Sequence, residues 1–107
     1  MPVVWPSGFT CLATLNGAQA TVEISGELDM STAPELSRSL SEVLDRHPRE
    51  VTVDLGRLAF IDSTGLTLLV RTSNSLKQHD GALRLTRPTP PVRRVLEIVG
   101  LDGLLVA

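Results

Sequence analysis

The hydrophobic pattern of this chain changes its period along the sequence, and this change limits the folds that the chain can adopt. Apolar and small polar residues alternate along residues 9–15 and 20–25, as they do in half-buried strands. Asn16-Gly17 between them is a strong hairpin signal, for a turn of two residues or slightly more. Further along, apolar residues at helical spacing alternate with short apolar runs. The sequence therefore predicts an α/β fold in the order ββαβαβα, with an optional last strand at residues 104–106 and a mixed β-sheet covered by about three or four helices.

Proline, glycine and capping residues mark where the predicted helices begin and end. Thr32, followed three residues later by Glu35, matches a capping box, and Pro34 suits the first helical turn. Three helices are predicted: one begins at the cap near Thr32 and is ended by Pro48, one follows residues 62–65 and is closed by Gly81, and one opens at Thr89 and is stopped by Gly100. The strands predicted between them lie at residues 51–55 and 82–86, with a further apolar run at residues 58–61.

Length and composition favour one cytoplasmic domain. The 107 residues suffice for a single core, and residues 1–8, which contain two prolines and a glycine, are predicted to form an N-terminal arm before a domain at residues 9–107. A formal net charge of -2 and only three aromatic residues argue against direct binding of nucleic acid. No apolar run reaches the roughly 20 residues that span a bilayer, and no secretion signal is recognisable. We expect a cytoplasmic location and no membrane partner.

The sequence shows no set of residues that is typical of a metal site, a redox centre or a hydrolase. Cys11 has no second thiol, and with His47 and His79 it shows no metal-ligand spacing. Ser63 is not in a G-x-S-x-G elbow, and solvation or the helix dipole explains the histidines better than catalysis. We predict no catalytic residue, no cofactor and no metal. An enzyme with Ser63 as nucleophile is the competing hypothesis, and it predicts turnover that is lost in Ser63→Ala.

The segment Asp62-Ser63-Thr64-Gly65 lies where a predicted strand ends and a helix begins. Binding sites are common at this position in open α/β sheets. A structural interpretation also fits, in which Asp62 or Ser63 caps the helix and Gly65 permits close packing. The two interpretations are compatible, because a phosphate on a hydroxyl at a helix start would meet free N–H groups and the positive end of the helix dipole.

Residues 60–66, Phe-Ile-Asp-Ser-Thr-Gly-Leu, resemble the signature of the STAS family. A second match is Gly-Glu-Leu-Asp at residues 26–29, followed by Thr-Ala-Pro-Glu-Leu at residues 32–36. Both occur in the order found in the family, and the predicted element order agrees with the family fold over residues 9–106. The combination is more specific than either match alone.

This resemblance implies a bacterial anti-sigma-factor antagonist that works by partner switching. The unmodified protein would bind an anti-sigma factor, which is also a serine kinase, and so release a sigma factor. Phosphorylation of Ser63 would inactivate the antagonist, and a serine phosphatase would restore it. The residues that the resemblance places at the partner-binding surface are Asp29, Met30, Thr32, Asp62, Ser63, Thr64 and Gly65.

Alternatives stay open for several of these residues and for the role itself. Asp29 and Asp62 fit capping or turn positions equally well, and Met30 is either a partner contact or a packed side chain. The arginines of the last third are interpreted as a solvated face: Arg84, Arg87, Arg93 and Arg94. Within the family, the alternative role is an interaction module of another signalling or lipid-transport complex.

Overall fold

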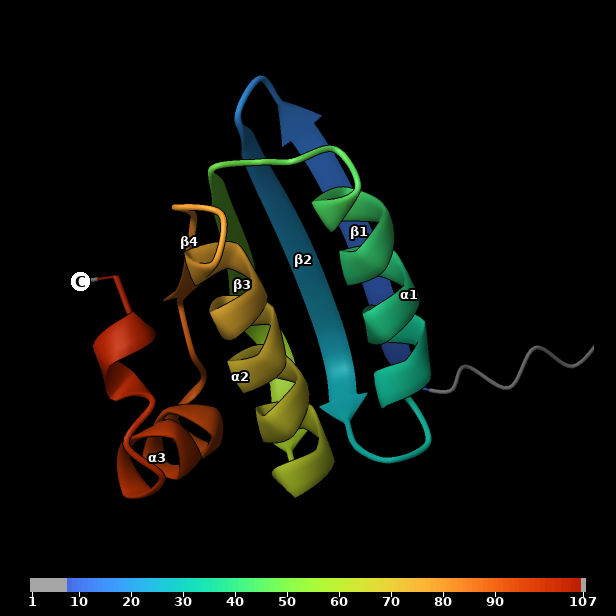
Figure 1. Cartoon of the computed structure of the whole chain (residues 1–107). Coiled ribbons are helices and arrows are strands. Elements are labelled where there is room, and N and C mark those ends of the chain that lie inside the picture. Colours follow the sequence, from blue (N-terminus) through green and yellow to red (C-terminus); the bar gives the residue numbers. More distant parts are fainter. Residues whose placement is uncertain (1–7, 107) are drawn as a thin grey trace, which may run out of the picture.

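The computed structural model describes residues 8–106, so the predicted arm at residues 1–8 lies outside the described residues except for Gly8. Four strands form one sheet in the order β1-β2-β3-β4 (Figure 1). Their bounds are β1 Phe9–Asn16, β2 Gln19–Leu28, β3 Glu50–Ile61 and β4 Ala82–Thr86. The first pair is antiparallel and the other two pairs are parallel, which confirms the predicted mixed sheet.

Two helices cover one face of this sheet. In Figure 1, α1 (Ala33–Leu44) lies in front of β1, and α2 (Ser63–Lys77) lies beside it in front of β3. The sheet residues on the covered face form an aliphatic core with α1 and α2, and they include Val22, Val51, Val53, Leu55, Leu83 and Leu85. The opposite face carries alternating polar residues that are exposed or half-buried, among them Thr21, Glu23, Thr52, Asp54 and Arg84. The predicted period of two therefore separates a buried face from a polar face.

Strand β2 runs three residues further than predicted and includes most of the Gly-Glu-Leu-Asp segment. Its pairing with β3 shifts register between Glu23 and Ser25 and again between Gly26 and Glu27. Gly26 has a positive φ of 94°, and a Cβ there would lie 1.1 Å from the carbonyl oxygen of Gly8. Only glycine fits at this position of the irregular strand, which ends at Leu28.

The two apolar runs at residues 51–55 and 58–61 are joined in β3 as one strand of 12 residues. β4 pairs only with Glu50–Asp54, so the second half of β3 has no strand on that side. Helix α3 (Pro90–Ile98) packs against β3, and the Thr89 hydroxyl donates a 2.7 Å hydrogen bond to the carbonyl of Leu58. The strand β3 ends at Ile61, directly before the Asp62-Ser63-Thr64-Gly65 segment.

The predicted last strand is reduced to a single bridge. A turn of 3-10 helix, η1 (Asp102–Leu104), precedes a parallel bridge between Leu85 and Leu105. The Val106 N–H donates to the Leu85 carbonyl at 2.9 Å. Among the described residues, no helix is long and apolar enough to cross a membrane.

Candidate functional site

Two loops meet where β2 and β3 end. These strands are parallel, and Leu28 pairs with Ile61 at the last position of each. The Asp62 N–H then donates to the Leu28 carbonyl at 3.1 Å. The loop from β2 to α1 therefore lies beside the start of α2. The structure brings together the two segments that the sequence singled out 33 positions apart, Asp29 and Asp62.

Asp29 organises the first loop. Its carboxylate accepts hydrogen bonds from the Ser31 N–H at 2.9 Å, the Ser31 hydroxyl at 2.7 Å and the Thr32 N–H at 3.2 Å. The Ser31 hydroxyl is the main cause that lowers the pKa of Asp29, so this side chain is a carboxylate at neutral pH. These contacts give Asp29 the turn role that the sequence allowed, and its contact with a partner stays a prediction.

Thr32 does not form the predicted capping box. It stands at the N-cap of α1, but its side chain makes no capping hydrogen bond, and its φ and ψ of -106° and -20° are helical rather than extended. Its hydroxyl instead donates to the Glu27 carbonyl at 2.8 Å and accepts from the Asp29 N–H at 2.9 Å. With only 4% of its surface exposed, Thr32 holds the loop from inside. A partner would meet the loop rather than the Thr32 side chain.

Replacing Thr32 with valine is expected to lower the free energy of unfolding by about 1–2 kcal/mol, because it removes both hydroxyl hydrogen bonds at a buried position. Thr32→Ser keeps the hydroxyl and is expected to cost less, about the value of one buried methyl group. Urea unfolding followed by far-UV circular dichroism measures both. Equal losses in the two variants would show that the hydroxyl does not hold this loop.

Asp62 caps α2, as one sequence interpretation proposed. Its backbone is extended, and its carboxylate accepts a 3.1 Å hydrogen bond from the Gly65 N–H. Ser63 and Thr64 open the helix and are exposed, whereas Gly65 is buried. A Cβ at Gly65 would lie 2.7 Å from Cγ of Leu28, so close packing accounts for this glycine. In this segment Asp62 and Gly65 therefore have structural roles, whereas Ser63 and Thr64 present two exposed hydroxyls.

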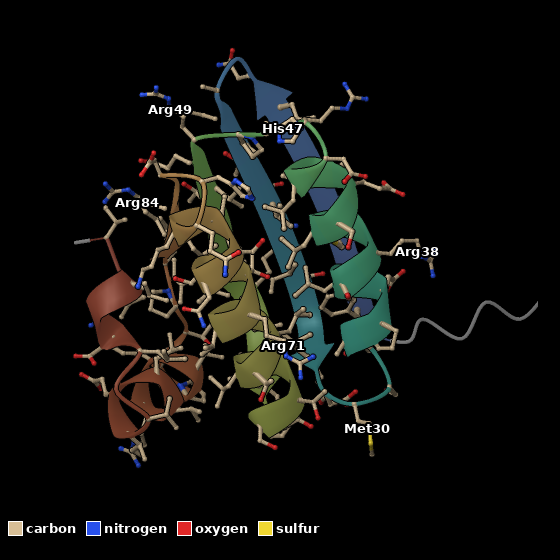
Figure 2. The ribbon with its side chains drawn as sticks, viewed as in Figure 1. Met30, Arg38, His47, Arg49, Arg71 and Arg84 are labelled. Atoms are coloured by element: carbon tan, nitrogen blue, oxygen red, sulfur yellow. The ribbon has the colours of Figure 1, made fainter. Side chains whose placement is uncertain are left out.

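A groove between α1 and α2 begins at these loops. It has a volume of about 580 Å³ and is lined by Met30, Ala33, Pro34, Ser37, Ser63, Thr64, Thr67, Leu68 and Arg71. Met30 is 75% exposed, which excludes the packed interpretation of its side chain. In Figure 2, Met30 projects from the loop at the lower end of α1, and Arg71 extends from α2 on the side of α1. Six of these lining residues were not predicted from the sequence as site residues: Ala33, Pro34, Ser37, Thr67, Leu68 and Arg71.

The groove residues on α2 could have been predicted in part from their spacing in the sequence. Ser63, Thr67 and Arg71 are spaced four residues apart on α2, so they fall along one side of the helix. The contribution of α1 could not be found in this way, because it depends on how the two helices pack. The groove as a whole therefore depends on the packing of α1 against α2.

The histidines lie far from Ser63. His47 and His79 line a separate hollow of about 400 Å³ beyond the C-terminal ends of α1 and α2. Ser63 opens α2, whose 15 residues give it a length of about 22 Å. A base must lie within hydrogen-bonding reach of a nucleophile, so neither histidine can activate Ser63 in this fold. Among residues 8–106, no group of three or more metal-ligating side chains comes together.

Two of the four arginines of the last third are paired on the polar face of the sheet. Arg84 contacts Glu50 at 2.9 Å, and Arg87 contacts Asp54 at 3.0 Å. Burial raises the pKa of Asp54, but hydrogen bonds from Arg87 and from the Gly56 N–H outweigh it, so the net pKa is lowered. These pairs fit the expected solvated face.

The fold and these loops define a small α/β domain with a candidate binding site at the carboxyl ends of two parallel strands. The chain belongs to the STAS family, since residues 11–107 match the family model described as Mlab, STAS domain. Over 84 residues it is 37% identical to the anti-sigma-B factor antagonist of Staphylococcus aureus (strain NCTC 8325 / PS 47), covering 78% of each chain.

Solved structures agree with this assignment. An anti-sigma factor antagonist from Mycobacterium paratuberculosis is 31% identical with a TM-score of 0.82, and the match covers 94% of this chain and 85% of that one. The anti-sigma factor antagonist SpoIIAA in its unphosphorylated form also has a TM-score of 0.82, over 91% of this chain and 86% of its own. At 22% identity, the likeness to SpoIIAA concerns the fold alone.

Proposed function

We propose that this chain is a cytoplasmic anti-sigma-factor antagonist. In its unmodified form it binds an anti-sigma factor that is also a serine kinase, and so releases a sigma factor. The kinase transfers the γ-phosphoryl group of ATP to the Ser63 hydroxyl, which loses its proton, and ADP leaves. A serine phosphatase hydrolyses the phosphate ester and restores binding. The antagonist itself needs no cofactor and no catalytic residue.

One observation carries this proposal: the exposed Ser63 hydroxyl opens a helix at the edge of the groove between α1 and α2. An exposed hydroxyl is accessible to a kinase without unfolding of the domain. The exposed Met30 beside it offers the apolar contact that protein interfaces favour. The sequence relatives named as anti-sigma factor antagonists support the role.

The position of Ser63 also explains how a phosphate could act as an off-switch. Free N–H groups and the positive dipole end at the start of α2 tolerate the added charge within the domain. In a closed interface, the same group of about two negative charges must lose water and would be repelled by any carboxylate opposite. Folding would therefore be preserved while binding is lost.

The test combines intact mass with binding. The protein and Ser63→Ala are each incubated with ATP and a panel of purified anti-sigma-factor kinases from the source organism, and complexes are measured by size-exclusion chromatography. We expect one kinase to bind both proteins before ATP is added, and to add one phosphate to the wild type alone, which then dissociates. Modification of Ser63→Ala, or binding that persists after full phosphorylation, would contradict the switch.

A second candidate is an interaction module of another signalling or lipid-transport complex. It is supported by the family model that matches the chain, whose description names Mlab rather than an anti-sigma-factor antagonist. This role predicts a stable complex with a protein other than an anti-sigma factor, and no phosphate on Ser63. The same panel separates the two roles when a component of such a complex is included.

A further inference from the structure

Arg71 introduces a positive charge into the groove between α1 and α2. It is the one charged residue among the nine that line the groove, whereas the others are apolar or carry neutral polar groups. The ion pairs found in residues 8–106 engage Arg84 and Arg87, and Arg71 takes part in neither. Its side chain is exposed on α2 and extends on the side of α1 (Figure 2). The guanidinium is thus presented to an incoming molecule.

The surroundings of Arg71 limit what that molecule can be. Ala33, Pro34 and Leu68 supply apolar surface along the groove, and Met30 adds more at its end. Asp29 and Asp62 place two carboxylates at the loops from which the groove begins. A nucleic acid needs several cations along its backbone and would be repelled by those carboxylates. A protein segment with an apolar side chain and one carboxylate matches the single guanidinium.

We propose that Arg71 is a specificity-determining residue that pairs with a carboxylate of the anti-sigma factor, next to an apolar side chain seated in the groove. This inference rests on the proposed function and adds the chemistry that the partner must present. A partner without a carboxylate at that position would leave Arg71 desolvated and unpaired, so it would be rejected. Ser63 lines the same groove eight residues before Arg71 on α2, so a partner segment that pairs with Arg71 would also cover the residue that is phosphorylated.

The experiment measures binding of the partner kinase from the panel above by isothermal titration calorimetry. The variants are Arg71→Gln, Arg71→Glu and, as a matched control, Arg38→Gln on α1, whose side chain points away from α2 (Figure 2). We expect Arg71→Gln to weaken binding about tenfold or more, Arg71→Glu about 100-fold, and Arg38→Gln less than about twofold. Reversal of one exposed carboxylate of the partner to lysine should restore binding to Arg71→Glu.

The outcomes separate this inference from the function on which it rests. If both Arg71 variants bind as tightly as Arg38→Gln while phosphorylation of Ser63 still abolishes binding, the inference is overturned and the antagonist role stands. If Arg71→Glu binds weakly but no charge reversal in the partner restores it, the pairing is also overturned. If the wild type binds no anti-sigma factor, both proposals fall.

Discussion

Replacing Ser63 with aspartate is expected to lower the affinity for the anti-sigma factor about 100-fold and to leave the stability of the domain unchanged. An aspartate at the first position of α2 interacts favourably with the helix dipole, by about 0.3–1 kcal/mol. Repulsion from Asp62 next to it offsets part of this gain, so we expect the free energy of unfolding to stay within about 0.5 kcal/mol of the wild type. Binding must instead bury the new charge, and a cost of about 3 kcal/mol corresponds to 100-fold.

Asn74→Asp provides the matched control for Ser63→Asp. It adds the same charge to the same helix at an exposed position, but Asn74 lines a different hollow, between α2 and the segment after α3. Calorimetry with the anti-sigma factor and urea unfolding of the two variants separate affinity from stability. Equal affinities for Ser63→Asp and Asn74→Asp would show that net charge, rather than the position of Ser63, weakens the complex.

Replacing Gly65 with valine is expected to lower the free energy of unfolding by about 3 kcal/mol. A Cβ at this position would lie 2.7 Å from Cγ and 2.8 Å from Cδ2 of Leu28, and 3.0 Å from Cγ1 of Ile61. Leu28 and Ile61 are buried, at 0% and 3% exposure, and end the two inner parallel strands, so neither can yield without moving the ends of these strands. The gain in helix propensity over glycine, about 0.4 kcal/mol, is too small to compensate.

The control for this substitution is Gly103→Val. A Cβ at Gly103 would meet no atom within 4 Å, so we expect a change of less than about 1 kcal/mol. Urea unfolding of both variants measures the difference. If Gly65→Val unfolded at the same urea concentration as Gly103→Val, close packing would not explain the glycine, and its presence in the segment would need a reason in partner binding.

The contrast between Ser63 and Gly65 shows how one short segment serves both the fold and the site. Gly65 and the Asp62 cap hold the start of α2 against β2 and β3. Ser63 and Thr64 lie between them in the chain and face solvent. Substitutions at the buried positions are therefore expected to act on stability, and substitutions at the exposed positions on binding.

Part of the site could be predicted because its causes are local. Asp62 caps a helix through a hydrogen bond to the N–H three residues ahead, which sequence spacing can indicate. The same spacing failed at Thr32, because its hydroxyl accepts from the Asp29 N–H and donates to the Glu27 carbonyl, which are competing groups of the loop just before it. The capping signal was thus correct at Asp62 and wrong at Thr32, where neighbouring backbone groups of the same loop compete for the side chain.

The sequence by itself determined the order of the elements, the hairpin at Gly17, the start of α2 and the alternation that gives the sheet one buried face. These features depend on neighbours within about four positions along the chain, so composition and spacing specify them. The family resemblance already implied that Asp29 and Asp62 share one surface, but only the tertiary structure decided how these loops meet, that Met30 is exposed and that Arg71 enters a groove. Those features follow from the parallel pairing of β2 with β3 and from the packing of α1 beside α2, which join residues that are distant in the sequence.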